Sequence, residues 1–270
     1  MPTASLLAQN IGITKMSKLP KKRRKAPPIT EEMSGGIRLN TDGWSVMLER
    51  GFINSYEKRT NYIWMDISEK KNPREFKQLN EPFATYFPDE TAPIPYKYGK
   101  INNFYQFKFG VGQKRQLSGK LDKKNVVIHW TYGAGLSIGF LKPYYLDVLV
   151  VEGNGTLSRK EGSYYDEGIS QYYEDDLYVV FNQQAQVNAI AGGTFFTKGF
   201  GEIKMKPGLS ARSGFYFDFA PSKKSFLGVE IGASVEMYPS KIDIMANADN
   251  NTGTFINLYL DARFGKRWSK

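Results

Sequence analysis

The sequence contains no cysteine and a single histidine, His129. The absence of cysteine excludes disulfide bonds, thiolate catalysis and most zinc sites. Any histidine-dependent acid-base mechanism would have to use His129. Ser137 falls on the same predicted face but not beside His129, and the sequence shows no serine-histidine motif. We therefore expect no enzyme activity, no cofactor and no metal site.

Long apolar runs are also lacking. No stretch reaches the roughly 18 consecutive apolar residues typical of a transmembrane helix. In their place the chain has 17 tyrosines, 18 phenylalanines and 26 glycines, a mixture that favours strands and turns. Strands that alternate apolar and polar residues can still cross a membrane, because their average hydropathy stays low.

Two runs near the carboxyl terminus show this alternation most clearly. In residues 225–238 (SFLGVEIGASVEMY) and 255–268 (FINLYLDARFGKRW), one face is apolar and the other mixes glycine with charge. Successive side chains of a strand point to opposite faces, and each run exceeds the roughly 9 to 11 residues of a tilted strand that crosses a bilayer. The simplest structure is a closed sheet with lipid outside and a polar interior.

Further strands are expected at residues 60–68, 103–112, 125–140 and 206–219. The face of 125–140 opposite its apolar residues is mostly small, as the interior of a narrow barrel requires. Together the runs predict an all-β fold, an antiparallel up-and-down transmembrane β-barrel of eight strands, or up to ten. The residues expected to face lipid are Val126, Ile128, Trp130, Leu136, Ile138, Phe140, Leu227, Val229, Ile231, Val235, Ile256, Leu258, Leu260 and Phe264.

Charged residues fall on the opposite, inward face of the last three strands. In a narrow barrel such groups must pair, because an uncompensated buried charge costs several kcal/mol. We expect a lumenal ion-pair network, with a proton or solute path as the alternative. Its predicted members are Arg212, Asp218, Glu230, Glu236, Asp261 and Arg263.

The segment 35–53 has two interpretations. A two-residue hairpin turn at Asp42-Gly43 would pair Thr41 with Trp44, Leu39 with Val46 and Ile37 with Leu48. Alternatively, one long strand carries a bulge at the same dipeptide. The choice changes the strand count and reverses the side to which the following connections belong. Two of these, residues 69–100 and 142–202, are long, and the second is expected to hold short strands of its own.

Residues 1–33 are expected to form a disordered basic tail that precedes a barrel domain at residues 34–270. Residues 1–32 carry seven basic and two acidic residues, about half of the net charge of +10. Residues 5–9 (SLLAQ) are typical of the end of a signal peptide, although an ordinary disordered terminus is the alternative. The run KKRRK also suits a nuclear or nucleic-acid patch, but the strand pattern favours an envelope protein without nucleic acid.

Several segments resemble a known family. GGIRLNTDGWSVMLERG, YGKINNFYQFKFGVG and the closing FINLYLDARFGKRW are similar to outer-membrane β-barrel proteins of Gram-negative bacteria, in an uncharacterised branch. The resemblance runs from about residue 34 to the end. It implies a location in the cell outer membrane, with membrane lipid and lipopolysaccharide as neighbours and long loops open to envelope protein partners. It transfers no activity and no catalytic residues.

The sequence therefore predicts an integral outer-membrane protein with a structural, interaction or porin-like small-solute role. One alternative is a soluble lipocalin-like barrel that binds an apolar ligand, which would turn its apolar face inward. A second alternative is an outer-membrane lipid hydrolase.

Overall fold

The computed structural model describes residues 29–54, 58–81, 83, 94–118, 126–153, 156–181, 185–219, 224–246 and 251–269. The predicted tail and signal-peptide remnant therefore lie, up to residue 28, outside the described residues. The first barrel strand begins at Glu31, three residues before the predicted start of the barrel domain at residue 34.

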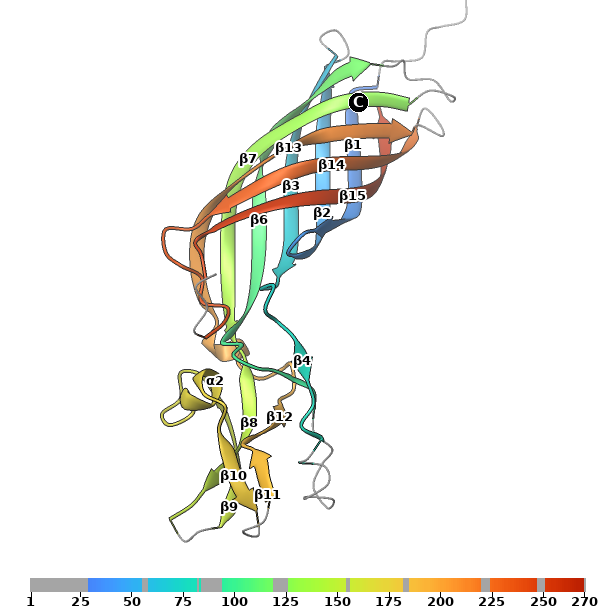
Figure 1. Cartoon of the computed structure of the whole chain (residues 1–270). Coiled ribbons are helices and arrows are strands. Elements are labelled where there is room, and N and C mark those ends of the chain that lie inside the picture. Colours follow the sequence, from blue (N-terminus) through green and yellow to red (C-terminus); the bar gives the residue numbers. More distant parts are fainter. Residues whose placement is uncertain are drawn as a thin grey trace, which may run out of the picture.

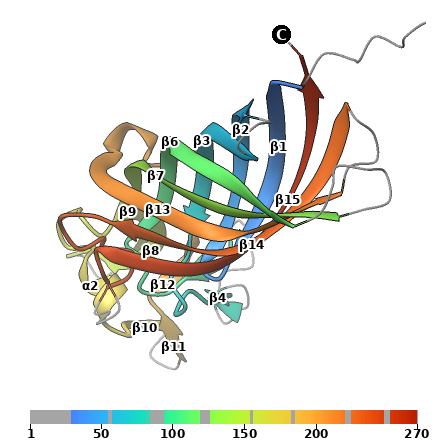
Figure 2. The same ribbon diagram turned by 90° about the horizontal axis from the view of Figure 1, so that it is seen from above.

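Eight strands form one closed antiparallel barrel, which confirms the predicted fold class (Figures 1 and 2). Each strand pairs with its neighbours in the chain, and the first pairs with the last, so the topology is up-and-down. No helix among the described residues is long and apolar enough to cross a membrane. The barrel strands are β1 (Glu31–Asn40), β2 (Gly43–Asn54), β3 (Arg59–Lys70), β6 (Asn102–Ser118), β7 (Val126–Pro143), β13 (Lys204–Phe219), β14 (Ser225–Met237) and β15 (Thr254–Trp268).

The alternation in sequence becomes a division between outside and inside. Along β15, Ile256 is 76% exposed on the outer surface, whereas Asp261 is fully buried in the lumen. Every residue predicted to face lipid lies on the outer surface, exposed or half-buried. Because the apolar side chains point outward and the charged ones inward, the lipocalin-like alternative is wrong.

The segment 35–53 forms a hairpin, but its register differs from the predicted one. Thr41 and Asp42 make the turn, so Leu39 lies opposite Trp44 and Ile37 opposite Val46. Contacts with other strands explain the shift: the Thr41 N–H donates to the Leu258 carbonyl, and Lys70 Nζ donates to both carboxylate oxygens of Asp42 at 2.9 and 2.8 Å. Gly43 belongs to β2, where a Cβ atom would overlap the Glu69 carbonyl oxygen.

The two ends of the barrel differ. At one end, here called the turn end, lie the beginning of β1, the end of β15 and the strand ends that the short segments 55–58, 119–125 and 220–224 connect in sequence. At the other, the loop end, lie the Thr41-Asp42 turn and three long connections, 71–101, 144–203 and 238–253. Short turns at one end and long loops at the other are typical of outer-membrane barrels.

The described residues of the three long connections form a folded cap below the barrel in Figure 1. Its main element is a three-stranded sheet in the order β12-β8-β9. The prediction of short strands within 142–202 is thus confirmed. The cap elements are β4 (Lys77–Gln78), β5 (Tyr96–Lys97), β8 (Tyr145–Val151), β9 (Leu157–Ser163), α2 (Gln171–Glu174), β10 (Tyr178–Phe181), β11 (Ala185–Asn188), β12 (Ile190–Gly193) and η1 (Phe200–Glu202).

The cap has its own apolar core, which draws on two connections: Phe83 and Tyr96 from the first, and Leu146, Val148 and Tyr173 among others from the second. A second cluster joins the cap to the barrel rim. In it, Ile242, Ile244 and Met245 pack with Phe104 and Leu141 of the barrel strands. The Ile101 N–H donates to the Ile244 carbonyl at 2.9 Å, so the third connection folds over the loop end.

Candidate functional site

The lumen is the first candidate site, and all six residues predicted to form its charge network lie buried inside it. They come from β13, β14 and β15, where every second residue points inward. Only Arg263, Asp261 and Glu230 pair directly with one another. Arg212 and Glu236 find partners on β2, β3 and β6, whereas Asp218 pairs with Arg267 of β15, which the prediction did not include.

Near the loop end, lysines and carboxylates alternate. Lys70 Nζ lies 2.8 Å from Asp42 Oδ2 and 3.1 Å from Glu236 Oε2. Lys108 Nζ lies 3.3 Å from Glu236 Oε1 and 3.2 Å from Asp66 Oδ1. Arg38 continues the series, with Nη1 3.7 Å from Asp66 Oδ2. Each shared carboxylate therefore links one cation to the next.

The middle of the network is built around arginines. Arg38 Nη2 lies 2.9 Å from Asp261 Oδ2, which is also 2.7 Å from Arg263 Nη2. Arg263 further contacts Glu230 at 2.5 Å and Glu49 at 2.9 Å. Arg212 Nη2 lies 3.2 Å from the same Glu49 oxygen.

The network continues to the turn end. Lys114 pairs with Glu49 and, at 2.9 Å, with Glu32. Arg267 pairs with Glu32 at 3.0 Å and with Asp218. A continuous series of opposite charges thus runs through the whole length of the barrel.

Aromatic rings fill the space between the charges. The Arg38 guanidinium carbon lies 4.0 Å from the centre of the Tyr259 ring, and that of Arg212 lies 4.5 Å from Trp64. Lys114 Nζ lies 4.8 Å from Tyr216. An eight-stranded barrel is just wide enough for side chains to fill its interior. Here long cationic and aromatic side chains lie buried in it and contact one another.

The prediction missed most of the network, although the signal was present. Lys108 follows Phe107 in a visibly alternating strand and therefore points to the other face. Asp66 and its neighbour Ile67 on β3 have the same relation. Extending the inward-face rule from the last three strands to the first ones would have identified these positions. The missed members are Glu32, Arg38, Asp42, Glu49, Asp66, Lys70, Lys108, Lys114 and Arg267.

His129 lies on the lumenal side of β7 and lines a cavity of about 300 Å³ at the turn end, together with Tyr216 and Asp218. Its ring centre is 5.9 Å from that of Tyr216. Ser137 lies elsewhere and shares a 2.6 Å hydrogen bond with the Tyr238 hydroxyl. The two residues considered for a lipid hydrolase are therefore not brought together.

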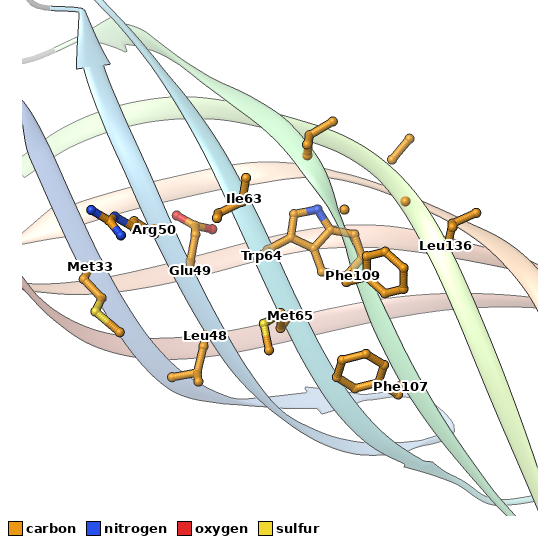
Figure 3. A pocket seen from close by; sticks show the side chains of 14 residues that line it. Met33, Leu48, Glu49, Arg50, Ile63, Trp64, Met65, Phe107, Phe109 and Leu136 are labelled. Carbon is orange, nitrogen blue, oxygen red and sulfur yellow. The ribbon is translucent and has the colours of Figure 1, made fainter.

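The outer surface carries an apolar groove of about 740 Å³ across β1, β2, β3, β6 and β7. Figure 3 shows Met33, Leu48, Ile63, Met65 and Phe109 along it. Gly110 and Gly135 face each other on β6 and β7, where a Cβ atom on Gly110 would lie 2.7 Å from the Gly135 Cα. Gly110 and Gly135 occupy inward positions, and their backbone lines the groove together with the small outward residue Ala134.

Among the described residues of the cap, Glu75 forms a buried ionic cluster with two lysines. Glu75 Oε2 lies 2.5 Å from Lys97 Nζ and 2.7 Å from Lys100 Nζ. Burial opposes ionisation of Glu75, but the two ammonium groups prevail and lower the pKa of its carboxyl below the ordinary value of 4.5. Burial also lowers the pKa of Lys100 to about 8, against the opposing attraction of Glu75.

No family model matches this sequence. No curated protein matches it either.

Several solved barrels overlay on the chain at low similarity. Neisserial surface protein A is 7% identical, with a TM-score of 0.37, over 89% of this chain and 96% of that one. The attachment invasion locus protein of Yersinia pestis is 12% identical, with a TM-score of 0.36, over 88% and 99%. The amino-terminal barrel of Pseudomonas aeruginosa OprF is 5% identical, with a TM-score of 0.33, over 88% and 97%.

The assignment of the fold rests on this chain's own geometry. Its eight strands close in an up-and-down order, its exterior is apolar, its interior is charged, and its connections are short at one end and long at the other. These four features together define the architecture of an outer-membrane β-barrel.

Proposed function

We propose that this protein is a closed, non-enzymatic barrel of the outer membrane that holds a folded cap at the cell surface for interaction with other molecules. The observation that carries the proposal is the ion-pair network, which occupies the lumen from Asp42 to Asp218. A barrel blocked in this way is suited to anchoring rather than to the passage of solutes.

The cap supports the interaction role. Three connections contribute to it, it has an apolar core, and it is far more elaborate than a barrel needs for closure alone. Large apolar side chains remain exposed on it, among them Phe76, Val151 and Tyr178. Exposed apolar residues on a unit with its own core favour contact with another protein of the envelope or of the surroundings.

The orientation follows from the lengths of the connections. In outer-membrane barrels the short turns face the periplasm and the long loops face outward. The loop end and cap then lie at the cell surface, where lipopolysaccharide is the expected neighbour, and the apolar exterior contacts membrane lipid.

Orientation can be tested by labelling, because the native chain has no cysteine. We expect Gly153→Cys, in the cap, to react with a membrane-impermeant maleimide in intact cells. Ser269→Cys, beyond the last strand, should react only after the outer membrane is permeabilised. The reverse pattern would contradict the orientation.

The closed lumen is tested by reconstituting the full chain in planar lipid bilayers. We expect no steady unitary conductance, because Arg263 and its three carboxylate partners fill the cross-section. A stable open level like that of a general porin would refute the anchoring role and favour solute passage.

A further inference from the structure

A small pocket of about 170 Å³ lies at the loop end, where β7 leaves the barrel and meets the cap. Four of its lining residues are lysines: Lys77, Lys97, Lys142 and Lys198. No carboxylate lines it; the remaining walls include tyrosine and phenylalanine rings. The pocket is therefore positively charged and aromatic.

Lys142 is exceptional among the buried lysines of this protein. It is 3% exposed, and in the described part of the chain it forms no ion pair. Its ammonium group lies 4.8 Å from the centre of the Phe196 ring and 5.0 Å from that of Phe200. The other buried lysines are Lys70, Lys100, Lys108 and Lys114, and each has a carboxylate within 3.3 Å.

A buried cation without an anion is costly, and aromatic rings offset only part of that cost. The other lysines of the pocket do not supply the missing negative charge. Lys97 is paired with Glu75 and Lys198 with Glu161, whereas Lys77 forms no ion pair within the described ranges. Two lysines without an ion pair among the described residues thus line one pocket, Lys142, which is buried, and Lys77, which is exposed.

The rim beside the pocket is strongly apolar. Phe195 is 71% exposed and Phe196 62% exposed, and Phe200 follows them on η1. Exposed aromatic residues at the edge of a membrane barrel are typical of the interface between headgroups and acyl chains. Cations beside such rings suit a ligand that has a negative headgroup joined to an apolar body.

We propose that this pocket binds the phosphate group of an anionic amphiphile of the outer leaflet, with Lys142 and Lys77 as its phosphate contacts and Phe195 and Phe196 against its acyl chains. The phosphate belongs to a membrane lipid and is not free phosphate. The inference rests on the cell-surface placement of the loop end in the proposed function, but not on the closed lumen.

The test measures binding by the full chain in detergent micelles, with bisphosphorylated lipid A as the probe. We expect Lys142→Gln to weaken binding at least tenfold, and the double variant with Lys77→Gln to weaken it further. The matched control is Lys266→Gln, which removes an exposed lysine from the turn end of β15 and should leave binding unchanged. Because Lys142 has no carboxylate partner, its substitution should leave no unpaired charge and should not disturb folding. The variant should therefore show the same difference in gel mobility between heated and unheated samples as the wild-type protein.

Two comparison probes identify the ligand's source. Dephosphorylated lipid A should bind the wild-type protein as weakly as lipid A binds Lys142→Gln. Inorganic phosphate should bind much more weakly than lipid A; equal affinity would replace the lipid site with a free-anion site and overturn the proposal. Unchanged lipid A affinity in Lys142→Gln would also overturn it. These measurements in micelles are independent of the labelling in cells, so failure of the placement and failure of the site give different results.

Discussion

Arg263 is the residue on which most of the lumenal network converges. It is fully buried and contacts Asp261, Glu230 and Glu49, three carboxylates that are buried as well. Removing one partner from a buried ion pair leaves an uncompensated charge, which is more harmful than the loss of the attraction itself.

We therefore expect Arg263→Met to destabilise the barrel by about 3–5 kcal/mol. The measurement is a gel assay in which samples are incubated at increasing temperatures before electrophoresis. The readout is the temperature at which the band changes from the mobility of the folded form to that of the unfolded form. Lys266→Met is the control, since it changes the same strand on its exposed face. Equal conversion temperatures for the two variants would show that the network contributes little.

Glu75 gives the cap a dependence on acid. The pKa of Glu75 is lowered in the folded protein, so its contribution to stability is fully present above pH 4.5 and is lost as the pH falls below that value. We expect amide hydrogen exchange in residues 94–101, corrected for intrinsic rates, to increase between about pH 6 and about pH 3. Glu75→Gln should show little change over that range, and a wild-type response equal to that of the variant would contradict the role of Glu75.

At the scale of elements, β6 depends on a small residue at one inward position. A Cβ atom on Gly112 would overlap the Tyr62 ring and lie 2.6 Å from the Tyr132 carbonyl oxygen, to which the Tyr62 hydroxyl donates at 3.2 Å. Any side chain there displaces Tyr62, which lies against the Arg212 guanidinium.

Gly112→Ala should accordingly cost about 1–3 kcal/mol, as overpacking of a filled interior generally does. Gly153→Ala is the matched control, because a Cβ atom at Gly153 meets no atom within 4 Å. The gel-conversion temperature is again the readout, and a Gly112→Ala value at or above that of Gly153→Ala would contradict the tight packing.

The strands could be predicted from sequence because alternation is a local property. The runs at 225–238 and 255–268 became β14 and β15 almost unchanged. The hairpin register was wrong because contacts of Thr41 with β15 and of Asp42 with β3 position the turn, and neither is local. Likewise, inward charges could be recognised from parity, but their pairing depends on how strands distant in the sequence are staggered.

The cap could not be predicted for a related reason. Its core joins Tyr96 with Leu146 and Tyr173. The second cluster, which joins the cap to the barrel rim, brings Ile244 against Phe104. Except for Phe104 of β6, these residues come from connections, and those that each cluster joins are widely separated in the sequence. The same holds for Lys142, whose lack of a carboxylate partner becomes visible only when its surroundings are assembled.

At the scale of the whole molecule, barrel and cap are expected to be separable. β7 and β13 pair continuously from Leu141 with Lys204 to Val126 with Phe219, without residues of the cap sheet. We expect that replacing residues 146–192 with a short glycine-serine linker leaves an inserted, heat-modifiable barrel. Failure of this variant to insert, with normal insertion of the full chain, would show that the cap is required for assembly.

The pairing of β1 with β15 bears on whether molecules can leave the lumen sideways, between two strands. Ten residue pairs join these strands, and the Arg38–Asp261 and Glu32–Arg267 ion pairs cross the same seam inside the lumen. A sideways exit between the first and last strands would break backbone hydrogen bonds and separate buried charges at the same time. The seam between the first and last strands is thus held by backbone pairing and by buried charge together, and both oppose its opening sideways into the lipid.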